Sequence, residues 1–176
     1  IGSSFELTCP HKSTITLVEW KINPKVGQPC TLAYRMDQKR INTTNCSDSM
    51  NWKFRTDRDL ALEIQQVGIS HEGCYTCEVA AQEGNFHETY QLTVLVPPRL
   101  MLYCDHHGNP MCEAAAGKPA AQISWAPEGN STCEEEGHDN GTVTVLSRFT
   151  EHSTSVINAT CFVSHPAGNQ SKSIAC

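Results

Sequence analysis

The spacing of four residues constrains this chain more than any other feature of its sequence. Cys9 is followed by Trp20 and, much later, by Tyr75 and Cys77, so that the two cysteines lie 68 residues apart. In an immunoglobulin-type sandwich, such cysteines cross-link the two sheets, the tryptophan packs against the bridge and the tyrosine hydroxyl closes the corner before the second cysteine. Because each residue has a separate physical role, the combination predicts a Cys9–Cys77 disulfide within such a sandwich.

The second half of the chain repeats this frame with a shorter spacing. Cys112, Trp125 and Cys161 follow the same order, and the cysteines lie 49 residues apart. The difference corresponds to about two strands, at ~8–12 residues for a strand and its turn. The first half therefore has room for the extra strands C′ and C″ of a variable-type domain, whereas the second half is constant-type, or C2-like. We predict an all-β chain of two tandem immunoglobulin-like β-sandwich domains, with a second frame disulfide between Cys112 and Cys161.

The boundary between the two domains is marked by Val96-Pro97-Pro98. Proline lacks a backbone donor and stops a strand ladder, and two prolines stiffen a linker. We expect the variable-type domain over residues 1–96 and the constant-type domain over residues 97–176.

Composition indicates a secreted or cell-surface context. Ten cysteines in 176 residues are typical of an oxidising compartment. The 13 basic and 19 acidic side chains argue against a nucleic-acid partner. There is no signal peptide and no apolar run near ~20 residues, so the sequence is interpreted as the mature extracellular portion of a longer protein. Sequons for N-glycosylation occur at Asn42, Asn45, Asn130, Asn140, Asn158 and Asn169.

The other cysteines suggest further disulfides. Cys30 and Cys46 flank the inserted C′–C″ segment, and a bridge between them is the simplest pairing. Four cysteines remain, and they allow three connectivities: Cys74, Cys104, Cys133 and Cys176. The spacing alone does not choose among these. We favour Cys104–Cys176, because the first and last strands of a sandwich often run side by side.

Three patterns suggest chemistry, but each has a simpler interpretation. Cys74 and Cys77 fit a redox C-x-x-C spacing, although Cys77 already belongs to the frame. The pair His106-His107 matches no zinc spacing and fits a polar turn. The run Glu134–Glu136 lacks the ligand spacing of a calcium loop and fits a solvated loop. With no nucleophile elbow or phosphate-binding loop, we expect neither an enzyme nor a cofactor.

The candidate functional site is therefore a surface. In a variable-type domain, strands G, F, C, C′ and C″ form one sheet, whose connections often serve recognition. We expect Gln82–Phe86 to form the F–G loop, with Phe86 at its tip as an aromatic anchor or tucked into the loop, and Tyr90–Val96 to form strand G. Glycans on Asn42 and Asn45 would restrict the C′–C″ edge. The predicted ligand-binding face comprises Lys21, Tyr34, Arg35, Asp37, Lys39, Glu83, Asn85, Phe86 and His87.

Six stretches spread over both domains form a distinctive set. The longest is Gly117–Trp125, with the sequence GKPAAQISW. The others are Cys30–Arg35, Glu83–Phe86, Leu95–Pro98, Asn140–Val145 and Val163–His165. Together, these stretches resemble one family, the receptors for the OX-2 membrane glycoprotein.

This resemblance implies the extracellular portion of a single-pass type I receptor in the plasma membrane of myeloid and related leukocytes. The first domain would bind OX-2, itself a two-domain immunoglobulin-type glycoprotein, through the G-F-C-C′ sheet. Signalling would be inhibitory, through tyrosine motifs in a tail, or activating, through a membrane adaptor. The extra Cys74, Cys104 and Cys176, and Phe149 where the family pattern has a cysteine, favour a receptor-like paired relative. The alternatives are a receptor-like protein that does not bind OX-2, with a related or unknown ligand, and a self-associating adhesion module.

Overall fold

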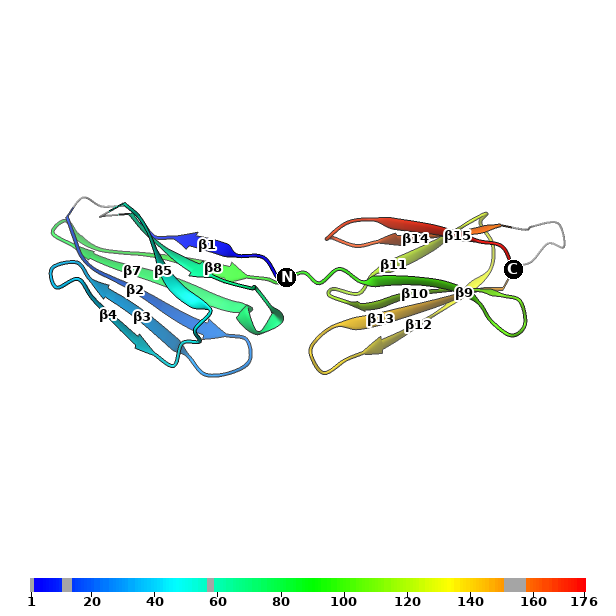
Figure 1. Cartoon of the computed structure of the whole chain (residues 1–176), viewed down its shortest axis with the longest axis horizontal. Coiled ribbons are helices and arrows are strands. Elements are labelled where there is room, and N and C mark those ends of the chain that lie inside the picture. Colours follow the sequence, from blue (N-terminus) through cyan, green and yellow to red (C-terminus); the bar gives the residue numbers. More distant parts are fainter. Residues whose placement is uncertain (1, 11–13, 57–58, 151–157) are drawn as a thin grey trace. The chain divides into compact units, whose positions relative to one another are not determined.

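The computed structural model of the chain describes residues 2–10, 14–56, 59–150 and 158–176 (Figure 1). These residues form strands, turns and one short 3-10 helix. The chain divides into two compact units, Ile1–Val94 and Leu95–Cys176. Each unit is a sandwich of two antiparallel sheets, which confirms the predicted all-β fold. Within the second unit, Val96 pairs with Lys118, and the Val96 N–H donates to the Lys118 carbonyl at 3.0 Å.

In the first unit, a three-stranded sheet of order β1-β6-β5 faces a five-stranded sheet of order β4-β3-β2-β7-β8. The smaller sheet contains β1 (Phe5–Thr8), β5 (Met50–Thr56) and β6 (Asp59–Ile64). The larger contains β2 (Ile15–Pro24), β3 (Cys30–Arg35), β4 (Arg40–Thr44), β7 (Gly73–Ala81) and β8 (Gly84–Leu92). The short helix η1 spans Ile69–His71. Strands β3 and β4 are the predicted C′ and C″ additions.

The frame residues form the centre of the first core. Cys9 and Cys77 are joined across the sandwich with their Cα atoms 5.7 Å apart. Trp20 and Tyr75 are fully buried. The Tyr75 hydroxyl donates to the His71 carbonyl at 2.6 Å, which closes the corner where β7 begins. A second disulfide joins Cys30 to Cys46 and closes the segment that carries β3 and β4.

In the second unit, a four-stranded sheet of order β12-β13-β10-β9 faces a three-stranded sheet of order β11-β14-β15. The four-stranded sheet contains β9 (Arg99–Cys104), β10 (Pro110–Gly117), β12 (Ser131–Gly137) and β13 (Val143–Phe149). The three-stranded sheet contains β11 (Gln122–Ala126), β14 (Ala159–Ser164) and β15 (Gln170–Ile174). The strands leave no room for C′ and C″ additions, as expected for a constant-type domain.

The second core repeats the first with one change. A Cys112–Cys161 disulfide joins the sheets, and the Trp125 indole N–H donates to the buried Ser147 hydroxyl at 2.8 Å. Phe149 occupies the position where the family pattern has a cysteine. Its ring packs on Trp125 with the centroids 5.3 Å apart and is almost completely buried. Phe149 is therefore a residue of the second core.

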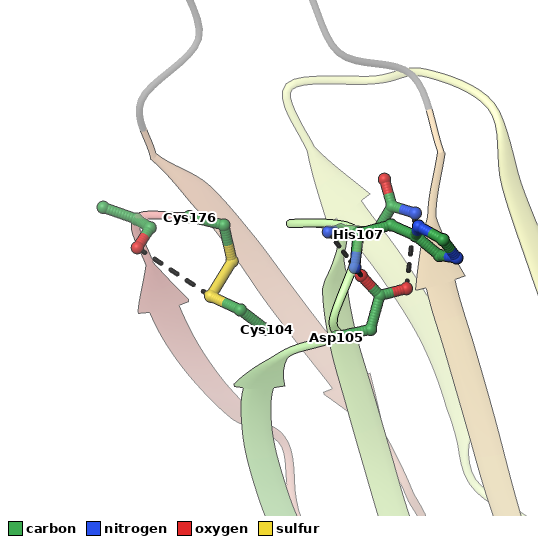
Figure 2. The surroundings of a disulfide bond; sticks show 6 residues. Cys104, Asp105, His107 and Cys176 are labelled. Atoms are coloured by element: carbon green, nitrogen blue, oxygen red, sulfur yellow. Dashed lines mark hydrogen bonds between the residues drawn. A yellow bond between two sulfur atoms is a disulfide. The ribbon is translucent and has the colours of Figure 1, made fainter.

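A fourth disulfide ties the end of the chain to β9. Figure 2 shows Cys104, the last residue of β9, joined to Cys176, and their Cα atoms lie 5.9 Å apart. Beside it, Asp105 begins the β9–β10 turn and accepts hydrogen bonds from the backbone N–H groups of His107 at 2.9 Å and Asn109 at 2.8 Å. These bonds hold the pKa of the Asp105 carboxyl below its usual value. The pair His106-His107 thus lies in a polar turn, as predicted.

Two local predictions are wrong. Strand β8 spans Gly84–Leu92 and pairs with β7 from the Ala81–Gly84 position onward. Gln82 and Glu83 therefore form the whole turn where a longer F–G loop was expected, and strand G begins before Tyr90 and ends before Val96. The predicted solvated loop over Glu134–Glu136 is an edge strand, β12, paired with β13. Every residue of β12 is exposed, so the strand lacks the alternation that sequence reasoning looks for.

Candidate ligand-binding face

The outward face of the five-stranded sheet follows from the alternation of its central strands. Trp20 of β2 and Cys77 of β7 lie directly opposite each other and are fully buried. Because successive side chains of a strand point to opposite faces, the neighbours of these two residues point away from the core. The register extends the alternation to β3, β4 and β8. The outward face carries Leu17, Glu19, Lys21, Arg35, Asn42, Thr76, Glu78, Ala80, Asn85 and His87.

The structure separates the predicted ligand-binding residues into three groups. Those on the outward face of the strands are Lys21, Arg35, Asn85 and His87. Those in turns at one end of the sheet are Asp37 and Lys39, between β3 and β4, and Glu83, between β7 and β8. The third group, Tyr34 and Phe86, occupies positions whose side chains lie on the inner face of the sheet, towards the core.

Tyr34 and Phe86 are aromatic residues of the inner face. Tyr34 lies opposite Val18, and its ring contacts Phe54 with the centroids 5.3 Å apart. Phe86 lies opposite the buried Val79 and packs against the first core. The prediction that Phe86 stands at the tip of a loop is therefore wrong, because Phe86 belongs to β8.

A shallow hollow of about 350 Å³ lies on the outward face over β2, β7 and β8. Its apolar part comes from Leu17 and Ala80, and its polar part from Glu19, Glu78, Asn85 and His87, with Val79 and Phe86 at its border. Of the residues that point outward into the hollow, sequence reasoning missed Leu17, Glu19, Glu78 and Ala80. Their alternation with Val18, Trp20, Cys77 and Val79 was the signal that would have placed them on the outward face.

The hollow is the acidic end of the face. Glu19 and Glu78 lie directly opposite each other on neighbouring strands. Lys21 Nζ lies 3.2 Å from Glu78 Oε2, and both side chains are about half exposed. Glu19 is half-buried and, within the described part of the chain, has no ion-pair partner. Like charges opposite each other in a sheet are unfavourable, so this part of the surface favours a cation.

The strands beside the hollow are basic, and Arg35 of β3 lies directly opposite Leu17 of the hollow. Arg35 and Arg40 lie opposite each other on β3 and β4, and Lys39 stands in the turn between them. Arg35 Nε lies 3.7 Å from Asp37 Oδ1, an exposed pair that neutralises only part of this charge. The sheet thus presents an acidic hollow over β2, β7 and β8 and a basic hairpin over β3 and β4.

All six sequon asparagines are exposed. Asn42 lies on β4 opposite Ala33 and points outward from the five-stranded sheet. Asn45 follows the end of β4 with a φ of 59°. In the second unit, the Asn140 side-chain oxygen accepts hydrogen bonds from the Thr142 backbone N–H at 3.0 Å and the Thr142 hydroxyl at 2.6 Å. A glycan on Asn42 would cover the β3–β4 part of the face.

The described residues include two free cysteines, Cys74 and Cys133. Cys74 is half-buried on the outward side of β7, and Cys133 is exposed on β12. Partial burial, and then the charges of Glu135 and Glu134, raise the pKa of the Cys133 thiol, which disfavours the reactive thiolate. Among the described residues, no group of histidine, cysteine and carboxylate side chains is arranged to hold a metal ion.

Comparison with known proteins agrees with the architecture. Residues 1–95 match the model for the immunoglobulin V-set domain, and residues 108–172 match that for the CD80-like C2-set immunoglobulin domain. The chain is thus a two-domain member of the immunoglobulin superfamily, a V-set domain followed by a C2-set domain. The cell surface glycoproteins CD200 receptor 1-B and 1-A of Gallus gallus are both 57% identical over the whole chain, which spans 72% and 59% of their lengths. CD200 receptor 1 of Bos taurus is 45% identical over 96% of the chain, which spans 48% of that protein.

A solved structure gives the same result. The extracellular portion of mouse CD200RLa superposes with a TM-score of 0.94 at 39% identity, covering 99% of this chain and 95% of that one. The chain belongs to the CD200 receptor family, also called the OX-2 receptor family, whose members are cell-surface glycoproteins and not enzymes. It corresponds to the extracellular part of such a receptor. None of the described residues forms a helix long and apolar enough to cross a membrane.

Proposed function

We propose that this chain recognises a protein ligand of the immunoglobulin type, such as CD200, through the outward face of β4-β3-β2-β7-β8. The observation that carries the proposal is the shape and charge of that face: it has an acidic hollow over β2, β7 and β8 and a basic hairpin over the adjoining strands β3 and β4. The names of the relatives, which are CD200 receptors, support CD200 as the ligand.

The proposed setting is a leukocyte, with this chain as the extracellular portion of a single-pass type I protein in the plasma membrane. The ligand would bind the first domain, and a tail or membrane adaptor outside residues 1–176 would carry the signal. The extra disulfide at Cys104 and Cys176, and Phe149 in the second core, support a receptor-like paired member of the family. The same face would then hold CD200 or a related ligand.

The binding of the CD200 ectodomain of Gallus gallus to the immobilised chain, measured by surface plasmon resonance, tests this proposal. Thr76 lies on β7 at the centre of the outward face, where its hydroxyl contacts that of Thr89 at 3.2 Å. We expect Thr76→Arg to weaken binding by about 30-fold or more, because a long charged side chain on the outward face obstructs the docking of a protein partner and must lose its water there.

Ser124→Arg is the matched control, because Ser124 is an exposed residue of β11 in the second unit. This variant should bind like the wild type. If both variants bind with wild-type affinity, the outward face of the first domain is not the ligand site. If the wild type does not bind CD200, then CD200 is not the ligand.

A further inference from the structure

We infer that the hollow over β2, β7 and β8 is a subsite for an arginine side chain presented by the protein partner. This inference deepens the proposed function and rests on the partner docking against this face. It assigns the two carboxylates of Glu19 and Glu78 to the guanidinium, and the apolar surface of Leu17 and Ala80 to the aliphatic stem.

The carboxylates have the right arrangement for a guanidinium. Glu19 and Glu78 are directly opposite on adjacent antiparallel strands, which places their Cβ atoms roughly 5 Å apart. Both line the same hollow. Arginine presents its donors in a rigid planar fork that matches carboxylate geometry, and a single guanidinium can bridge two neighbouring acids. A lysine ammonium is a compact point charge that lacks this fork.

Glu19 is the main source of selectivity. It is half-buried beside Leu17, and in the described part of the chain it forms no ion pair. The charge of Glu78 is only partly compensated, because its contact with Lys21 is an exposed pair worth about 0–1 kcal/mol. A weak surface pair of this kind is readily exchanged for a partner's guanidinium.

The rest of the hollow fits the remainder of an arginine side chain. Leu17 and Ala80 lie opposite each other at the end of the hollow beyond Glu19 and Glu78. Long basic side chains cover apolar surface with their methylene groups while the charged head stays with polar partners. Asn85 and His87 of β8 complete the polar rim on the third strand. The volume of about 350 Å³ lies at the lower end of the range for small-molecule sites.

A small probe tests the subsite without any protein partner. The ¹⁵N-labelled two-domain chain is titrated with Nα-acetyl-arginine amide and followed by ¹H–¹⁵N NMR. We expect shift changes confined to the neighbourhoods of Leu17, Glu19, Glu78, Ala80 and His87. The double variant Glu19→Gln/Glu78→Gln should bind the probe about tenfold or more weakly, because each lost charged hydrogen bond is substantial. The spectrum of each variant also reports whether it is folded.

Two matched controls test whether binding requires the positive charge of the guanidinium and the carboxylates of the hollow in particular. The citrulline analogue of the probe has nearly the same shape without the charge, and it should cause no comparable shifts. Glu88 belongs to the same sheet, but it pairs with the buried Cys77 and so does not lie on the outward face. Glu88→Gln should therefore leave probe binding unchanged. Nα-acetyl-lysine amide serves as a third probe. The assignment would be overturned if the arginine probe and either its citrulline analogue or the lysine probe caused equal shift changes. Shift changes centred outside the hollow would also overturn it.

The protein partner provides the second arm. If the CD200 ectodomain binds the wild type and the Glu19→Gln/Glu78→Gln variant equally, the partner does not use the hollow and the inference is wrong. If CD200 does not bind but the arginine probe still perturbs the hollow selectively, the choice of CD200 fails and the arginine subsite stands.

Discussion

Replacing Tyr75 by phenylalanine tests the corner that fixes the start of β7. The Tyr75 side chain is fully buried, and its hydroxyl donates to the His71 carbonyl at 2.6 Å. The change removes the hydroxyl and leaves the buried His71 carbonyl without this hydrogen-bond donor, which lowers the free energy of unfolding by about 1–3 kcal/mol. For a domain of about 95 residues, this corresponds to a melting temperature lower by roughly 4–8 °C per kcal/mol.

Tyr90→Phe is the matched control. Its hydroxyl also donates to a backbone carbonyl, that of Thr8 at 2.9 Å, but the bond is exposed and water can replace it. We expect Tyr90→Phe to cost less than about 0.5 kcal/mol, within the range of ordinary surface changes.

Guanidinium unfolding followed by tryptophan fluorescence measures both changes. A Trp125→Phe background leaves Trp20 and Trp52 as emitters, and both belong to the first domain. The reasoning is that burial makes the Tyr75–His71 hydrogen bond strongly stabilising. It would be refuted if the two tyrosine variants lost equal free energy of unfolding, or if Tyr75→Phe lost less than about 0.5 kcal/mol.

Three further predictions concern stability. Burial raises the pKa of Tyr75 from 10.0 to about 12. The free energy of unfolding of the first domain should therefore fall by about 2–3 kcal/mol between pH 10 and 12, because the unfolded state loses the proton first. In denaturation measured as a function of pH, Tyr75→Phe should reduce this loss of stability. Ser147→Ala leaves the buried Trp125 indole N–H without an acceptor and should cost the second domain about 1–3 kcal/mol in guanidinium unfolding. Removal of the Cys104–Cys176 disulfide by a double alanine variant opens a 72-residue loop and should cost about 4 kcal/mol by the same measurement; wild-type stability would contradict either variant's prediction.

The fold was predictable because its frame residues have fixed positions in space. Cys9, Trp20 and Cys77 each have one role in a sandwich, so their order and spacing define the strands between them. Strand β12 was missed because it is an exposed edge strand whose glutamates show no alternation. The β7–β8 turn was predicted too long, because Gly84 resembles a loop residue, whereas its φ of 132° begins a strand after a tight turn.

The candidate face was predictable only in part. Lys21 follows the buried Trp20, and alternation alone places it on the outward side. Tyr34 lies two residues after Leu32, so the same rule would have placed it towards the core. The hollow could not be predicted, because it depends on which residues of β2, β7 and β8 are neighbours across three strands. The β7–β8 part of that register is set by the tight turn at Gln82-Glu83, which was predicted as a longer loop.

The Cys104–Cys176 bridge also determines how the chain transmits tension. A pull between the first domain and residue 176 enters the second domain at Leu95 and runs along β9 from Arg99 to Cys104. There it crosses the two sulfur atoms and leaves at Cys176. The six residues of β9 are the only strand on this covalent path. Strands β10 to β15, with the Cys112–Cys161 core, lie in a closed loop beside it and carry no load through the backbone. Stretching the molecule therefore releases no chain length from the second domain while the bridge is intact.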